Sequence, residues 1–351
     1  MEIYLYGAGV VAYGAYQAVR ELFGISVKGF LVTEEEGQPH EIDGISVFGI
    51  AKYQDRLSES KILIAVPEEY QDSIERELRN RSLFHYKRLD SHSEYELMGR
   101  YLKKTKRLSL IEDYETRGQS IHEEDICVYM AVSHRDKELK KKYQEEAWVK
   151  KIQVGAALTD ERLTELTDEG EDSLSVQNAL YGELTASYYA WKHNECGITG
   201  LFHYRRVLHV TKEQTQLLQT GKIDVILPLP FVCYPDASGQ YQRYVVSQDL
   251  EIMMQVLKER EKEAVYESCQ AILKMPYLYN YNMLIARKAV FDDYCGWLFP
   301  LLEEIAKRCE KEKRNRAPRY MGRIGEVLTS LYFMRNEKNW NVTHAEKVWR
   351  V

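Results

Sequence analysis

The sequence predicts an α/β protein made of two units. Its 351 residues suggest two domains, since a domain averages roughly 150 residues. Short apolar runs typical of strands alternate with helix-compatible segments as far as Asp90, and the alternation starts again at Ile126. Residues 93–124 are charged and helix-compatible without a strand pattern. We therefore expect units at 1–92 and 125–351, joined by a helical connector at 93–124.

Composition excludes several classes of protein. A hydrophobic content of 44% with 29% charged residues is typical of a globular protein. The net charge of -6 argues against a nucleic-acid partner. We see no apolar run of 18 residues and no signal-peptide pattern at MEIYLYGAG, so we expect a cytoplasmic protein. The basic run 103–107 leaves two alternatives open, a solvated face or peripheral association with the inner membrane surface.

The first strand, Ile3 to Tyr6, runs into Gly7-Ala8-Gly9-Val10-Val11-Ala12 and then a helix. Glycines in this position let the backbone approach a ligand, and a helix N-terminus attracts phosphate. Gly7, Gly9 and Ala12 are therefore candidate nucleotide-binding residues, and Glu34, after the second strand, could grip a ribose. The alternative is that the glycines serve only a tight turn.

Three motifs carry a resemblance for this first segment: the GAG turn, IDGISV and ILIAVPEEYQDSIERELRNR. Together they resemble the small Rossmann-like domain at the N-terminus of many sugar-processing bacterial proteins, including nucleotide-sugar acetyltransferases. The resemblance implies a nucleotide or nucleotide-sugar ligand. NAD is the less favoured alternative, because a complete dinucleotide domain needs two mononucleotide halves.

Charged side chains follow a strand of the second segment. The run GITGLF leads directly into His203-Tyr204-Arg205-Arg206. The carboxyl end of a strand is where α/β sheets keep their ligand crevices, and arginine matches phosphate oxygens bidentately. These four residues are therefore candidates for binding a diphosphate. Another apolar strand, Ile126 to Val132, runs into Ser133-His134-Arg135-Asp136.

The segment Asn178 to Lys192 is predicted to be one helix. Aromatic and leucine side chains recur there at helical steps, which is usually a core pattern. Asn178 lies at the predicted N-cap, and Glu183 falls off the apolar stripe.

Five motifs in order, NALYGELTASYYAWK, GLFHYRR, DVILPLP, YNYNMLIARKAVFDDYCGWLF and RYMGRIGEVL, extend over about residues 125–350. They resemble a family of bacterial capsular and exopolysaccharide glycosyltransferases named for an uncharacterised conserved domain. The resemblance implies a GT-A-like fold. It also implies transfer of a hexosyl unit, galactosyl or galactofuranosyl, from a nucleoside-diphosphate sugar to an oligosaccharide or lipid-linked acceptor. The motif positions carried over include Asn178, Tyr181, Lys192, Asn282 and Arg319.

Sugar transfer requires charge neutralisation on the diphosphate and, for inversion, a carboxylate base. No strand ends in Asp-x-Asp, so we expect Arg205 and Arg206 to replace or supplement a divalent metal such as Mn²⁺ or Mg²⁺. We predict no metal ligands. The candidates for the base are Asp249, Glu326 and Glu183.

Site roles divide between donor and acceptor. Asn178 and Lys192 join the HYRR residues as donor candidates. Sugar or acceptor contacts are expected from Tyr181, Tyr244, Asn282 and Arg319, with Tyr244 in a tyrosine-rich loop before Asp249. Some positions depart from the family pattern, such as Gln177, where a lysine is common. A non-catalytic nucleotide-sugar-binding module and an NAD-dependent sugar-modifying enzyme are therefore the alternatives.

Overall fold

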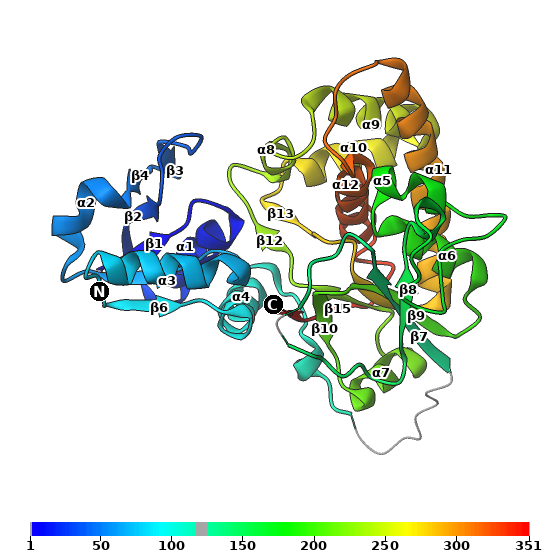
Figure 1. Ribbon diagram of the computed structural model, residues 1–351, viewed down its shortest axis with the longest axis horizontal. Coiled ribbons are helices and arrows are strands. Elements are labelled where there is room, and N and C mark those ends of the chain that lie inside the picture. The colour runs from blue at the N-terminus through cyan, green and yellow to red at the C-terminus, as the bar shows by residue number, and fades with distance from the viewer. Residues whose placement is uncertain (1, 117–124, 140, 351) are drawn as a thin grey trace. The chain divides into compact units, whose positions relative to one another are not determined.

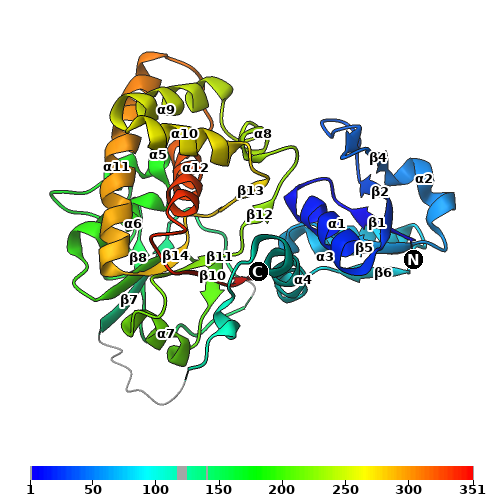
Figure 2. The same ribbon diagram turned by 180° about the vertical axis from the view of Figure 1, so that it is seen from behind.

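The computed structural model describes residues 2–116, 125–139 and 141–350 (Figures 1 and 2). Its internal contacts divide the chain into two units. The first unit comprises Met1–Leu108, Leu229–Ala237 and Pro276–Leu278. The second comprises Ser109–Pro228, Ser238–Met275 and Tyr279–Val351. Both units combine helices with a β-sheet, so the predicted α/β class is confirmed.

The first unit is built on a six-stranded sheet in the order β3-β4-β2-β1-β5-β6, parallel except for β3. Helices α1, α2 and α3 follow β1, β4 and β5 along the chain (Figure 1). The bounds are β1 Glu2–Tyr6, α1 Val10–Phe23, β2 Ser26–Val32, β3 Glu41–Ile42, β4 Ile45–Gly49, α2 Ile50–Leu57, β5 Lys61–Ile64, α3 Glu68–Asn80 and β6 Tyr86–Arg88.

Alternation along β1 divides the core of this unit between the two faces of the sheet. Leu5 packs with Ala12 and Ala15 of α1, whereas its neighbour Tyr6 packs with residues of α2 and α3, such as Leu78. Successive side chains of a strand point to opposite faces, so one short apolar strand buries both. Helices therefore cover the sheet on two sides.

Helix α4, Ser91–Lys106, belongs to the first unit, although the sequence placed most of it in a connector. Asp90 caps it by accepting a 2.8 Å hydrogen bond from the Ser93 amide. Its buried Met98 and Leu102 pack with Ala18 and Val232. Met98 and Leu102 are four residues apart, which is a helical spacing, but charged residues surround them in the sequence and make the pattern hard to recognise. Of the remaining connector residues, 107–116 include a short 3-10 helix, Ile111–Asp113, and residues 117–124 lie outside the described part of the chain.

Val232 reaches this cluster because two short strands belong to the first unit. Strands β12, Phe231–Val232, and β13, Tyr277–Leu278, pair antiparallel, and β12 contacts α1. They come from positions more than 120 residues beyond α4 in the chain. The first unit is therefore assembled from three separate stretches of sequence.

The second unit is built on a seven-stranded sheet in the order β10-β15-β11-β14-β9-β7-β8. Its strands are β7 Ile126–Val132, β8 Val149–Gln153, β9 Ile198–His203, β10 Arg206–His209, β11 Val225–Pro228, β14 Leu284–Arg287 and β15 Val342–Trp349. Its helices include α5 Asn178–Tyr181, α6 Leu184–His193, α7 Lys212–Gln219, α8 Ala237–Tyr241, α9 Ser247–Arg260, α10 Glu263–Leu273, α11 Lys288–Lys311 and α12 Tyr320–Arg335. Among the described residues, no helix is long and apolar enough to span a membrane.

Strands β7 and β9 place the candidate site. They are parallel neighbours, paired from Ile126 with Ile198 to Ala131 with His203. On its other side, β9 approaches β14 so closely that a Cβ at Gly200 would lie 2.1 Å from the Leu284 carbonyl oxygen. The residues that follow β7 and β9 therefore meet at one edge of the sheet, where α/β proteins bind ligands.

Candidate functional site

A cavity of about 200 Å³ lies at the carboxyl ends of β7 and β9, within the second unit. Cationic side chains dominate its lining, and two carboxylates join them. The charged and imidazole residues that line it are Arg135, Asp136, Lys137, Glu183, His203, Arg205, Arg206 and Arg319. Six candidates from the sequence therefore come together here: Glu183, His203, Tyr204, Arg205, Arg206 and Arg319.

Aromatic rings hold Arg206 in the cavity. Its guanidinium carbon lies 4.1 Å from the ring centre of Trp349 and 4.5 Å from that of Tyr281. Trp349 reaches it because β15 pairs antiparallel with β10, with Trp349 opposite Arg206. Cation–π contacts with two rings restrict the guanidinium, so little side-chain freedom remains to be lost when an anion binds.

Glu183 enters the cavity because the predicted helix 178–192 is interrupted. Gly182 has φ of 60° and ψ of -134°, a conformation that favours glycine, and it separates α5 from α6. Glu183 then occupies the N-cap position of α6. In a continuous helix Glu183 would lie on the helix surface. Because the helix is interrupted, Glu183 lies instead at the start of α6 and lines the cavity.

The buried side chain of Asn282 holds Glu183 through a hydrogen bond. Only 1% of Asn282 is exposed, and its side-chain nitrogen donates to Glu183 Oε1 at 2.9 Å and to the Gly322 carbonyl at 3.1 Å. Both partners are acceptors, so the orientation of the amide is fixed. Asn282 was expected to bind a sugar hydroxyl, whereas here it is buried and holds a carboxylate.

The backbone before Asn282 is strained. Tyr281 has φ of 77° and Asn282 has φ of 50°, two successive non-glycine residues in the left-handed region. A bulky side chain such as tyrosine rarely adopts this conformation, and strain of this kind concentrates at functional sites.

The Tyr281 backbone links two titratable side chains. Its amide donates to Glu326 Oε1 at 2.9 Å, and its carbonyl oxygen lies 2.6 Å from His203 Nε2. Burial, followed by the nearby Glu183 charge, raises the pKa of Glu326 to about 8. Burial also lowers the pKa of His203. Both groups are therefore neutral at neutral pH.

Asp136 lines the cavity but is not among the candidates from the sequence. The Ser133 amide donates to its Oδ2 at 2.7 Å, and burial raises its pKa to about 6. A signal was present, because Ser133-His134-Arg135-Asp136 follows β7 as His203-Tyr204-Arg205-Arg206 follows the strand beside it. Two charged strand ends on adjacent parallel strands predict a shared site.

Asp249 lies elsewhere, in a buried ion pair. Arg316 donates to both of its oxygens at 2.8 Å, Nε to Oδ2 and Nη2 to Oδ1. The two side chains are only 1% and 8% exposed. This carboxylate does not line the cavity, and its charge is neutralised by a bidentate partner. Such an arrangement is typical of a structural ion pair.

Three further candidates from the sequence also lie away from the cavity. Asn178 is buried and donates to the Gly182 carbonyl oxygen at 2.8 Å, so it supports the turn between α5 and α6. Tyr181 is 3% exposed and belongs to the core. Lys192 is exposed and forms an ion pair with Asp172 at 3.3 Å.

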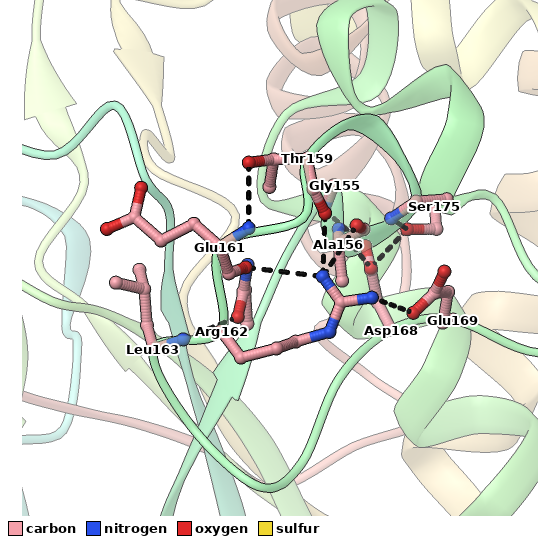
Figure 3. Close-up of polar contacts among 11 residues, drawn as sticks. Gly155, Ala156, Thr159, Glu161, Arg162, Leu163, Asp168, Glu169 and Ser175 are labelled. Carbon is pink, nitrogen blue, oxygen red and sulfur yellow. Dashed lines mark hydrogen bonds and ion pairs between the residues drawn. The ribbon is translucent and has the colours of Figure 1, made fainter.

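The loop between β8 and α5 is fixed by a buried carboxylate (Figure 3). Asp168 accepts hydrogen bonds from the amides of Gly155 and Ala156 at 2.9 and 3.2 Å, and from the Ser175 hydroxyl. Val154, directly before this turn, lines the cavity. The loop therefore gives one wall of the cavity a fixed position.

Tyr244 is 52% exposed and lies outside the cavity lining. Arg323 donates to its backbone carbonyl oxygen at 2.8 Å and lies over its ring.

The glycine turn of the first unit has a packing explanation. Gly7 has φ of 129°, and a Cβ there would lie 2.6 Å from the Ala65 carbonyl oxygen. Ala12 is fully buried in the core. Gly9 has nothing within 4 Å of a built Cβ, and Glu34 is exposed after β2. The close approach of Ala65, directly after β5, therefore requires Gly7, whereas Gly9 faces open space.

The side chains that line the cavity suit an anion better than a divalent cation. Four arginines and a lysine accompany only two carboxylates, and hard cations prefer several oxygen ligands. Within residues 2–116, 125–139 and 141–350, no three histidine, cysteine, aspartate or glutamate side chains are grouped so that they could hold a metal.

The cavity and its flanking helices lie within a recognised family segment. A family model described as a domain of unknown function, DUF4422, matches residues 128–338, which is more than half of the chain. Among curated proteins there is no match.

A solved structure, the WbbM bifunctional glycosyltransferase in its apo form, matches with a TM-score of 0.54 at 20% identity. The match covers 64% of this chain and 45% of the other, so the present chain matches less than half of that protein. The likeness establishes a shared fold. On the family match, the chain belongs to the DUF4422 family.

Proposed function

We propose that the protein is a glycosyltransferase that moves a sugar from a nucleoside-diphosphate donor to a glycan acceptor. One observation carries the proposal: the cavity at the carboxyl ends of β7 and β9 combines a cluster of cations with a carboxylate, Glu183. The fold shared with a glycosyltransferase structure supports it.

The cationic side chains are suited to a leaving diphosphate. Departure of a nucleoside diphosphate develops negative charge, and fixed donors at that position lower the barrier. Arg205 lies in the turn between β9 and β10 and Arg206 begins β10. Arg135 and Lys137 follow β7, and Arg319 lies at the start of α12. In this proposal the arginines replace or supplement a divalent metal.

Glu183 is the proposed base. It is the one carboxylate of the three sequence candidates that lines the cavity, and the Asn282 amide orients it. Glu326 has a raised pKa, so it is protonated at neutral pH and suits a supporting role better than that of a base.

The finer assignment rests on the resemblance of the motifs. We infer a hexosyl donor, galactosyl or galactofuranosyl, and an acceptor in capsular polysaccharide or exopolysaccharide synthesis at the cytoplasmic side of the membrane. The second unit is GT-A-like in this proposal, and the Rossmann-like first unit would bind a nucleotide through Gly7, Gly9 and Glu34.

Thermal shift with a panel of UDP-sugars and NAD, with and without Mn²⁺, would identify the donor, because a ligand stabilises the state that binds it. Release of UDP on addition of an oligosaccharide acceptor would then establish transfer. Binding without acceptor-dependent release would instead favour a non-catalytic nucleotide-sugar-binding module. Stabilisation by NAD alone would favour a dehydrogenase-like enzyme.

Replacement of the base gives a sharper test. We expect Glu183→Gln to lower kcat by roughly 100-fold to 10,000-fold, the usual contribution of a general base, while the affinity for the donor stays nearly unchanged. Glu169→Gln is the matched control, since Glu169 is exposed and pairs with Arg162. Wild-type turnover in Glu183→Gln would exclude Glu183 as the base.

A further inference from the structure

We propose that His203 recognises a sugar hydroxyl by accepting its hydrogen bond at Nδ1, instead of binding the diphosphate. This inference rests on the proposed function and assigns one residue of its cavity to the sugar. The sequence suggested another role for His203, in which it binds the diphosphate together with Arg205 and Arg206.

The hydrogen bond of His203 defines its tautomer. Nε2 lies 2.6 Å from the Tyr281 carbonyl oxygen, and a carbonyl oxygen can only accept. Nε2 must therefore carry the proton. In a neutral imidazole the other nitrogen, Nδ1, is then an acceptor with a lone pair. No hydrogen bond to Nδ1 is found in the described part of the chain.

The surroundings of His203 favour the neutral ring. The ring is partly buried, and the charges of Arg206 and Arg319 oppose a further positive charge. Glu183 acts in the opposite direction, but burial is the largest influence and the pKa is lowered. A second proton on the ring is therefore disfavoured at neutral pH.

An acceptor nitrogen has a clear chemical preference. Phosphate oxygens are acceptors, so they bind the arginine and lysine side chains, which only donate, and repel a lone pair. A hydroxyl can donate to Nδ1 while it accepts from a neighbouring guanidinium. Beside Arg206 and Glu183, His203 is therefore matched to a sugar hydroxyl, of either the donor or the acceptor.

Two variants separate the two nitrogens. In His203→Gln the longer side chain can still donate to the Tyr281 carbonyl oxygen but offers no acceptor at the Nδ1 position. In His203→Asn the shorter side chain can keep an acceptor oxygen near the Nδ1 position, but it loses the hydrogen bond to the Tyr281 carbonyl oxygen. We expect His203→Gln to lower kcat/KM about tenfold or more, and His203→Asn to lower it less.

The affinity for UDP is the discriminating measurement, because UDP carries the diphosphate without the transferred sugar. We expect both variants to bind UDP within about twofold of wild type. If the hydroxyl belongs to the donor, the affinity for the UDP-sugar falls in His203→Gln; if it belongs to the acceptor, the acceptor KM rises. A loss of UDP affinity equal to the loss of UDP-sugar affinity would overturn the proposal, as would wild-type kcat/KM in His203→Gln.

A readout independent of turnover keeps this inference apart from the proposed function. NMR of the ¹⁵N-labelled histidine rings, with His203→Gln to assign the signal, reports which nitrogen carries a proton. We expect the Nε2–H tautomer at neutral pH. A doubly protonated ring or an Nδ1–H tautomer would overturn the inference even if transfer is confirmed, whereas a protein that binds no UDP-sugar would overturn the proposed function while leaving the tautomer measurable.

Discussion

The two units end their central strands in different ways. In the first unit, β1 runs into Gly7 and Gly9, and carboxylates such as Glu34 follow the neighbouring strand β2. In the second unit, β7 and β9 run into arginines, a lysine and a histidine that line one cavity. Packing against Ala65 accounts for Gly7, but packing does not account for several cations at one edge. A glycine turn alone is thus a weaker indication of a phosphate site than charge concentrated at adjacent strand ends.

The largest expected effect tests the cationic edge directly. Arg205→Ala combined with Arg206→Ala should weaken UDP binding on the order of a hundredfold, because each change removes charge-assisted hydrogen bonds to the diphosphate. Isothermal titration would measure it. Arg314→Ala is the control, since Arg314 is exposed, forms an ion pair with Glu312 and does not line the cavity. Unchanged UDP affinity in the double variant would show that the cationic strand ends of the second unit do not bind the diphosphate. They would then be no better a phosphate site than the glycine turn of the first unit.

A buried charge away from the edge should affect stability and leave binding unchanged. Asp249→Asn leaves Arg316 without its bidentate carboxylate, and we expect a loss of about 3 kcal/mol in the free energy of unfolding. Thermal unfolding should show a fall of roughly 5–10 °C in Tm. The folded variant should bind UDP as wild type does. If Asp249→Asn lost turnover but kept its affinity for the donor, Asp249 would instead be the catalytic base.

The glycine turn offers a matched pair of variants. Gly7→Ala should destabilise the protein by about 2 kcal/mol, because φ of 129° is strained for alanine and its Cβ would meet the Ala65 carbonyl oxygen. Gly9→Ala should change stability by less than about 0.5 kcal/mol, because nothing lies near its Cβ. Chemical denaturation would measure both. If Gly9→Ala weakened nucleotide binding, the first unit would also be a phosphate site and the contrast would fail.

The last prediction concerns the pH dependence of stability. Glu326 has a pKa raised from 4.5 to about 8, so the folded state holds this proton more tightly than the unfolded state. Its contribution to stability is complete below pH 4.5 and is lost as pH rises through 8. Relative to Glu326→Gln, the wild-type Tm should therefore fall steadily as the pH rises from 5 to 9. Parallel Tm curves for the two proteins would show that Glu326 is ionised throughout this range.

The α/β class and the cationic strand end were predictable from the sequence. Strand periodicity and the charges at residues 203–206 both depend only on residues that are neighbours in the chain. Roles that depend on distant partners were not predictable. Arg316, which neutralises Asp249, is 67 residues away in the chain, and Asn282 reaches Glu183 across 99 residues. The break at Gly182 escaped detection as well, because the aromatic stripe on either side of it fits one uninterrupted helix.

The short strands β12 and β13 affect how the protein can be divided. The chain passes between the units after residues 108, 228, 237, 275 and 278, so no single cut releases the first unit intact. A fragment that ends at residue 108 would lack Val232 and would leave the apolar surface around Ala18, Met98 and Leu102 uncovered. Expression of the first unit alone therefore needs a graft of the β12–β13 pair. For the same reason, a recombination event that exchanged only the N-terminal segment would transfer an incomplete module.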